Sequence, residues 1–280
     1  MSSLLGALVA ATVLIVGGIA VGAAIGSGSA FYALALDLLV IGLVAAGALL
    51  AFKGRAIAGA GAVVTALATW VAFDYTAPAV LWTVLFFLGV GLAVWGTRAD
   101  TLDPGAWPLL IPRVAIGWAW LDNAQDHVRG ADWVPGGGAF LTQATNASNR
   151  QPGYFLDPLY QGFLKSVVVP NGDVWAGLTI AGEMAFGVLL ALGLLTPVAA
   201  IGSLWHSFHY FMMKGFVAHG GYTDKVFFAG DLLTLVTGAG LVYGLDASLR
   251  HHVPGFVARY LMAAPVAEHE VVPAPAPASA

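Results

Sequence analysis

The chain of 280 residues contains no cysteine and has few charged residues. Without cysteine, it cannot form a disulfide, an iron–sulfur cluster, a thiolate zinc site, a c-type haem attachment or a persulfide. Charged residues make up 9 % of the chain, against about 25 % in an ordinary soluble domain. Hydrophobic residues make up 59 %, so the polar groups that would cover a soluble fold are lacking. The composition therefore predicts an integral membrane protein.

The few charges are unevenly distributed along the chain. The first 97 residues hold only Asp37, Lys53, Arg55 and Asp74. The net charge is −4, and no basic stripe is present to meet the phosphates of a nucleic acid. We therefore expect the lipid bilayer to surround the chain, and we expect no nucleic-acid partner.

Long apolar segments predict an all-α fold, a polytopic membrane helix bundle of about eight transmembrane helices. A spanning helix needs about 20 apolar residues. The predicted spans are residues 3–26, 31–52, 56–74, 79–97, 108–122, 174–195, 197–213 and 226–245. The span 108–122 is short and contains Arg113 near its start, where an arginine can snorkel. Leaving it out gives the alternative of seven spans.

The basic residues between the spans predict the orientation in the membrane. Lys53 and Arg55 follow the second span, and Arg98 follows the fourth. The positive-inside rule makes these loops cytoplasmic, and with them both chain termini. The N-terminus carries no basic residue and its apolar run is long, so the first span is not read as a signal peptide.

The chain divides into three predicted parts. Residues 1–98 form a four-helix membrane unit with few charges, and residues 99–250 form a second four-helix unit. Residues 251–280 form a cytoplasmic tail rich in alanine and proline, which predicts disorder. Within the second unit, residues 123–173 are too aromatic for a solvated linker, so we expect an extracytoplasmic cap over a pocket. An N-glycosylation sequon begins at Asn146 in this cap.

Ionisable residues inside predicted spans are candidates for function. Placing an ionised side chain in hydrocarbon costs a free energy on the order of several kcal/mol, so such residues are rare unless they have a role. Glu183 lies near the middle of its span, and it is the only glutamate before the tail. Burial suits such a carboxyl group to proton transfer. A structural carboxyl group, protonated or hydrogen-bonded to another helix, is the alternative. We expect Glu183 to be buried and to contact His206, His209 or Asp231.

His206 and His209 lie three residues apart and share one helix face. Such a pair can relay protons to a quinone, ligate a metal or haem, or form structural hydrogen bonds between helices. Asp231 lies at a similar depth in the last span. The predicted catalytic residues are therefore Glu183, His206, His209 and Asp231. Arg113, Asp122, Trp118 and Trp205 are the predicted substrate-binding residues, and no metal site is recognised.

The stretch from Arg113 to Asp246 resembles the DoxX/DoxD family of four-helix membrane proteins, and most closely its DoxD branch. The resemblance begins with "RVAIGWAWLDNA" and continues through "DWVPGGGAFL" and "GEMAFGVLLALGLLTPVAA". It ends with "GDLLTLVTGAGLVYGLD". Family members often carry a lysine just after the first of these helices, where this chain has "DNAQDHVRG". The first four predicted spans have no counterpart in the four-helix family unit.

The resemblance implies a membrane subunit of a quinone-linked oxidoreductase, similar to that of thiosulfate:quinone oxidoreductase. Quinone is then the expected cofactor, and no flavin site is recognised in the chain. A small partner subunit or a second copy of the chain is an expected protein partner. The competing hypothesis is a non-enzymatic membrane protein, either an assembly scaffold or a transporter of small solutes or protons, since a transporter also carries a midplane carboxyl group.

Overall fold

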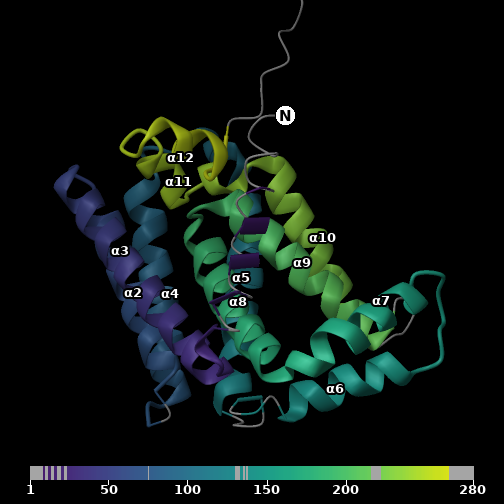
Figure 1. Cartoon of the computed structure of the whole chain (residues 1–280). Helices are drawn as coiled ribbons and strands as arrows, with labels where there is room; N and C mark the ends of the chain where they lie inside the picture. Colours follow the sequence, from purple (N-terminus) through teal and green to yellow (C-terminus); the bar gives the residue numbers. More distant parts are fainter. Residues whose placement is uncertain are drawn as a thin grey trace, which may run out of the picture.

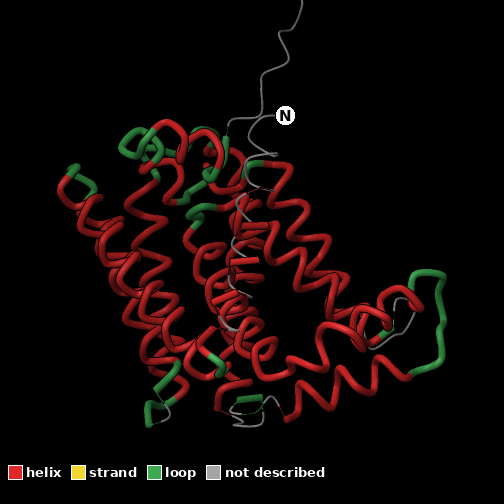
Figure 2. Tube along the Cα trace, in the orientation of Figure 1, coloured by secondary structure: helices red, strands yellow, loops and turns green. Residues whose placement is uncertain are grey.

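The computed structural model of the chain describes residues 24–74, 76–129, 133–134, 136, 138–215 and 222–264, with scattered positions between 9 and 21. The described residues form helices and connecting turns, and no strand occurs among them (Figures 1 and 2). The chain is thus an all-α helix bundle, as the sequence predicts. More than half of the first predicted span, residues 3–26, lies outside the described residues.

Seven long helices build the described part of the bundle. The first group consists of α2 (Gly28–Phe52), α3 (Ala56–Ala72) and α4 (Ala79–Thr97). The second group consists of α5 (Leu110–Arg129), α8 (Gly172–Leu192), α9 (Thr196–Lys214) and α10 (Tyr222–Thr237). Helix α2 packs on α3 and also on α8, so the two groups are joined through α2.

Shorter elements close the two ends of this bundle. One end, which we call the cap end, carries α6 (Gly138–Asn149), α7 (Asp157–Phe163), η2 (Leu164–Val168) and η3 (Val169–Asn171). The other end, which we call the tail end, carries η1 (Pro104–Leu109), η5 (Ala239–Leu241), α11 (Leu245–Leu249) and α12 (Gly255–Tyr260). Figure 1 shows α6 and α7 at the opposite end of the bundle from α11 and α12.

Three described segments are long and apolar enough to cross a bilayer. They are Gly28–Phe52, Ala79–Thr97 and the continuous helical stretch Asp157–Leu192. Helix α3 is apolar but shorter, with 17 residues. The chain is therefore a membrane protein, whereas its eight crossings and the cytoplasmic location of its termini stay predictions.

The last predicted span is wrong at its C-terminal end. Helix α10 ends at Thr237 rather than near residue 245. Gly238 has φ +63°, a left-handed conformation that favours glycine and interrupts a helix. The apolar residues after it, which read in the sequence as a continuing span, instead form η5 and the turn before α11.

The first part of the tail that the sequence predicts to be disordered, residues 251–264, is folded. Helix α12 lies within it, and Met262 and Ala263 are buried. The Ala263 N–H donates to Asp246 Oδ2 at 3.1 Å, which fixes this segment against α11. Composition alone missed this short helix because its hydrogen-bond partner lies elsewhere in the chain. Residues 265–280 lie outside the described part.

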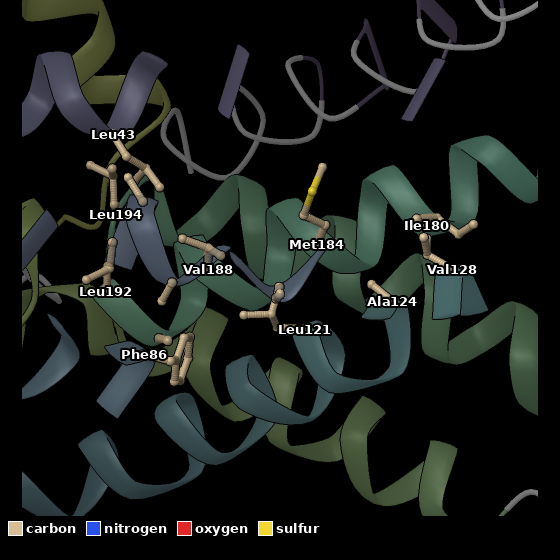
Figure 3. Close-up of a cluster of buried hydrophobic side chains, with 14 of the residues drawn as sticks. Leu43, Phe86, Leu121, Ala124, Val128, Ile180, Met184, Val188, Leu192 and Leu194 are labelled. Atoms are coloured by element: carbon tan, nitrogen blue, oxygen red, sulfur yellow. The ribbon is translucent and has the colours of Figure 1, made fainter. Parts of the chain in front are cut away.

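Helices α5 and α8 approach each other closely. A Cβ atom added at Gly117 would lie 2.5 Å from the Gly187 carbonyl oxygen, and one added at Gly187 would lie 2.7 Å from that of Gly117. Glycine at both positions therefore permits this backbone contact. Leu121, Met184 and Val188 fill the space beside it (Figure 3).

One aspartate joins α8, α2 and the cap. The Gly28 N–H donates to Asp173 Oδ2 at 2.7 Å, and the Gly136 N–H donates to Asp173 Oδ1 at 2.8 Å. Asp173 lies in the first turn of α8. This connection sets the first turn of α2 beside the cap and so places Phe31 at the site described next.

Candidate functional site

A cavity of about 240 Å³ lies between α8, α9 and the cap. Its walls are mainly aromatic and aliphatic. The aromatic residues that line it are Phe31, Phe140, Tyr160, Phe163, Trp175, Phe186, Trp205 and Tyr210. His206, His209 and Thr179 add polar groups. The cap supplies Phe140, Tyr160 and Phe163, in agreement with the expectation that a folded cap covers a pocket.

His209 presents a free nitrogen in this aromatic environment. Its Nδ1 lies 2.9 Å from the Tyr160 hydroxyl, which also lies 3.2 Å from the His209 carbonyl oxygen. Its Nε2 is buried and has no hydrogen-bond partner. The Trp205 ring packs edge-on against the imidazole, with ring centroids 4.2 Å apart. A buried polar atom without a partner is costly, so Nε2 is suited to a ligand.

His206 lies one turn before His209 and contacts α8. Its Nδ1 lies 3.2 Å from the Gly202 carbonyl oxygen. Its ring packs edge-on against Phe186 at 5.2 Å and against Trp120 at 6.1 Å between centroids. A Cβ atom added at Gly182 would lie 2.6 Å from His206 Nε2, so the imidazole rests against the α8 backbone beside Glu183.

Glu183 is fully buried, as predicted, and its hydrogen bonds come from residues that the sequence analysis did not single out. Asn123 Nδ2 donates to Glu183 Oε1 at 2.7 Å, and the Tyr210 hydroxyl donates to the same oxygen. Oε2 accepts no hydrogen bond, and His127 Nε2 lies 3.7 Å from it. The sequence predicts a contact with His206, His209 or Asp231, and none of these three residues supplies a hydrogen bond to Glu183 in the described part of the chain.

Asp231 belongs to a separate hydrogen-bond network between α9 and α10. Its Oδ2 accepts from the Ser203 hydroxyl at 2.5 Å and from the Ser207 hydroxyl at 3.4 Å. Trp120 Nε1 donates to the Ser203 hydroxyl oxygen. Asp231 is fully buried, and it does not line the cavity. The structure thus brings His206 and His209 to the cavity, sets Glu183 directly behind Tyr210, and places Asp231 elsewhere.

The predicted substrate-binding residues lie in different places. Trp205 lines the cavity and is 38 % exposed. Trp118 packs against Phe87 of α4, with ring centroids 6.1 Å apart. Neither Trp118 nor Asp122 lines the cavity, and Asp122 lies in the second half of α5.

Arg113 holds the tail end of the bundle together. It is fully buried, and its guanidinium donates to the carbonyl oxygens of Ala239, Val242 and Tyr243. Tyr243 has φ +52°, a strained conformation for a residue with a side chain. The guanidinium thus fixes the turn that follows α10, at the opposite end of α5 from His127.

Several residues around the cavity escaped the sequence analysis. Tyr210 follows His209 directly, and Asn123 lies within the "LDNA" stretch that carries the family resemblance. His127 lies in the "DNAQDHVRG" stretch, which stands out in the sequence only for the lysine that it lacks. Tyr160 carried no signal beyond the aromatic character of the cap. Tyrosine and asparagine are ordinary at helix ends in membranes, so only the three-dimensional contacts reveal their role.

The described residues hold no cluster of three or more histidine, aspartate or glutamate side chains that could bind a metal ion. The histidine pair faces an aromatic cavity with hydroxyl groups rather than further ligands. Aromatic walls with a few hydrogen-bonding groups suit a largely apolar ligand, which stacking and a few hydrogen bonds can hold.

Comparison with known proteins identifies a family over part of the chain. Residues 109–207, which comprise α5, the cap, α8 and most of α9, match the DoxX family. No curated protein and no solved structure matches the chain. The matched region contains Glu183, His206 and the cap residues around the cavity, whereas His209 and Tyr210 follow directly after its end. The chain is therefore a membrane protein that carries a DoxX domain over residues 109–207.

Proposed function

We propose that the chain is the membrane subunit of a quinone-linked oxidoreductase and that the cavity binds the quinone headgroup. The observation that carries the proposal is the free Nε2 of His209 in an otherwise aromatic cavity. An aromatic wall with few polar groups favours a flat, largely apolar ring that carries hydrogen-bonding oxygens.

The size of the cavity is consistent with this ligand. Its volume is about 240 Å³, somewhat below the roughly 300–1,000 Å³ of pockets that enclose whole drug-sized ligands. A headgroup of one or two rings fits such a space, while an isoprenoid tail remains outside. Trp205, at the exposed edge of the cavity, lies where such a tail would leave toward the lipid.

The hydrogen bond from Tyr160 favours a carbonyl oxygen as the partner of His209. Nδ1 of His209 is the closer of the two acceptors around the Tyr160 hydroxyl, at 2.9 Å against 3.2 Å. A hydroxyl that donates to Nδ1 leaves the imidazole hydrogen on Nε2. Nε2 is then a donor, and a quinone carbonyl oxygen accepts from it.

The reduction of a quinone to a quinol takes up two electrons and two protons. Glu183 and Tyr210 supply a proton-transfer pair at the wall of the cavity, because the tyrosine ring lines the cavity and its hydroxyl reaches the buried carboxyl group. General acid catalysis by a positioned group of this kind contributes about 10²–10⁴-fold to a rate.

Thiosulfate is the first electron donor to test, because of the resemblance to the DoxD branch. Oxidation of two thiosulfate ions to one tetrathionate ion releases the two electrons that one quinone accepts. In this proposal, a partner subunit or a bound redox group carries these electrons to the quinone.

A binding experiment with the purified protein tests the proposal. Trp175 and Trp205 line the cavity, so their fluorescence reports a bound ring. A short-chain ubiquinone or menaquinone analogue should quench this fluorescence saturably in nanodiscs. Membranes that contain the chain and its partners should then reduce quinone with thiosulfate, with thiols or with sulfide. If no saturable quenching and no reduction are seen, the scaffold or transporter hypothesis replaces this one.

A further inference from the structure

His127 connects the buried carboxyl group of Glu183 with the cap end of the bundle. It lies in the last turn of α5, and its side chain is 16 % exposed, whereas that of Glu183 is fully buried. Its Nε2 lies 3.7 Å from Glu183 Oε2 and 3.2 Å from the Tyr210 hydroxyl oxygen. One imidazole thus contacts both members of the pair behind the cavity and also reaches the surface.

The imidazole is held in one orientation. Its ring stacks on that of Trp133, with centroids 3.5 Å apart and an angle of 22° between the planes. Trp133 is itself buried and packs against Phe140 of α6. The cap therefore fixes the edge of His127 that points at Glu183, as a proton-transfer group requires.

Glu183 has one oxygen available for such a transfer. Oε1 accepts from Asn123 and Tyr210, whereas Oε2 is buried and accepts no hydrogen bond. Oε2 is also the oxygen that faces His127 Nε2. The Glu183 side chain is fully buried. A proton on Oε2 would neutralise it and so lower the free-energy cost of its burial.

We propose that His127 is the proton-entry residue of this site and that it delivers protons from the cap end to Glu183. In this step, Nδ1 of neutral His127 takes a proton from water at the surface, and the imidazolium that forms gives its Nε2 proton to Glu183 Oε2. Transfer of the Nδ1 hydrogen back to Nε2 through water restores the starting tautomer, and no electron moves. Glu183 then holds the proton behind Tyr210, whose ring lines the cavity and whose hydroxyl donates to Oε1.

Few other titratable groups lie around His127. Glu183 faces it from α8 and Tyr210 from α9. On its own helix, Asp126 precedes it and Arg129 follows. Arg129 donates to the carbonyl oxygens of Ala72, Asp74 and Ala77 in the α3–α4 turn, so its guanidinium is held away from Glu183. His127 is thus a titratable side chain that contacts Glu183 and is itself partly exposed.

This inference rests on the proposed function, which supplies the quinone as the final acceptor of the proton. Its test requires neither a quinone nor an electron donor. Infrared spectra of the protein in nanodiscs should contain a carboxylic-acid C=O band that disappears in Glu183→Gln. The deuterium shift of that band after a change to D₂O reports proton exchange at Glu183. His127→Gln should slow this exchange by at least about tenfold, given the 10²–10⁴-fold effect of positioned proton-transfer groups.

Two further variants separate proton transfer from folding. His251→Gln, which changes an exposed histidine at the tail end, should leave the exchange rate unchanged. In His127→Ala, added imidazole should restore the fast exchange, which a purely structural role of His127 would not allow. Exchange at the wild-type rate in His127→Gln, or no rescue by imidazole in a folded His127→Ala protein, overturns the inference. Fast exchange through His127 without any quinone binding would instead reject the proposed function alone.

Discussion

The Tyr210 hydroxyl donates a hydrogen bond to Glu183 Oε1, and the ring of the same tyrosine lines the cavity. This pair joins a carboxyl group without access to water to a space that can hold a ligand. Asn123 donates to the same oxygen from α5, so three helices of the DoxX domain meet at one carboxyl group. A substitution that keeps these hydrogen bonds but cannot carry a transferred proton directly tests the role of Glu183.

The first prediction concerns Glu183→Gln. Glutamine keeps the shape of the side chain and an oxygen that accepts from Asn123 and Tyr210, but it cannot carry the transferred proton. Folded yield should stay near that of the wild type, while electron transfer from donor to quinone falls by about 100-fold or more. The measurement is quinone reduction in membranes. Glu268→Gln, the same change in the tail, is the control, and a Glu183→Gln protein with wild-type turnover would exclude Glu183 from proton transfer.

The second prediction concerns the hydrogen bond that orients His209. Tyr160→Phe removes the hydroxyl 2.9 Å from Nδ1 and keeps the ring in the cavity wall. Loss of one hydrogen bond of about 1 kcal/mol corresponds to roughly fivefold weaker binding. The dissociation constant of a short-chain quinone, from tryptophan quenching, should rise by about this factor.

His209→Gln should weaken quinone binding more than Tyr160→Phe does, since it removes the nitrogen that faces the ligand. His206→Gln should have a smaller effect than His209→Gln, because His206 Nδ1 already contacts the Gly202 carbonyl oxygen. Equal affinities for wild type and His209→Gln would show that the ligand does not contact this imidazole.

The third prediction fills the cavity. Ala185 lines it, and a phenyl ring at this position would occupy the space intended for the headgroup. Ala185→Phe should abolish saturable quenching and quinone reduction while the protein remains folded. Val236→Phe adds a ring of similar size on the exposed face of α10 and serves as the control. Quinone binding that survives in Ala185→Phe would place the binding site elsewhere.

Parts of this architecture could be predicted from the sequence. Helices α2, α4 and α8 are long uninterrupted apolar segments, and such segments predict spanning helices without knowledge of their neighbours. The end of α10 could not be predicted, because "GAGLVYGL" is as apolar as the helix before it. Arg113, more than 100 residues earlier in the chain, binds the carbonyl groups of this turn.

Part of the candidate site could also be predicted from the sequence, because some of its residues are unusual in an apolar segment and others are not. Glu183, His206 and His209 stand out as ionisable groups in apolar segments. Their partners Tyr160 and Tyr210 do not, since a tyrosine is ordinary near a membrane interface. Asp231 stands out equally, yet it faces Ser203 and Ser207 rather than the cavity. Depth in a span can be read from the sequence, whereas the face that a side chain presents depends on how the helices pack.

The fourth prediction concerns Arg113, for which the sequence suggested a role in substrate binding. Lysine keeps the charge but cannot donate to three carbonyl groups in the geometry of a guanidinium. Arg113→Lys should lower the thermal stability of the purified protein, because hydrogen bonds to charged groups contribute about 1.5–3 kcal/mol each. The quinone affinity of the folded fraction should not change. A selective loss of affinity at unchanged stability would instead support substrate binding by Arg113.

The fifth prediction is the orientation of the bundle. Arg55 pairs with Asp100, and Ser248 donates to the same aspartate, so the α2–α3 turn, the segment after α4 and helix α11 meet at the tail end. Figure 1 shows α12 at this end as well. Lys53, Arg98, Arg250 and Arg259 belong to these segments. The positive-inside rule therefore predicts that the tail end is cytoplasmic.

Labelling of single cysteines tests this orientation directly, because the chain has no cysteine of its own. Cysteines at Lys53 and Gly255, both exposed at the tail end, should be protected from an impermeant maleimide in intact cells. Cysteines at Thr76 and Asn146, both exposed at the cap end, should be labelled. Labelling at Lys53 with protection at Thr76 would reverse the orientation, and His127 would then take up protons from the cytoplasm.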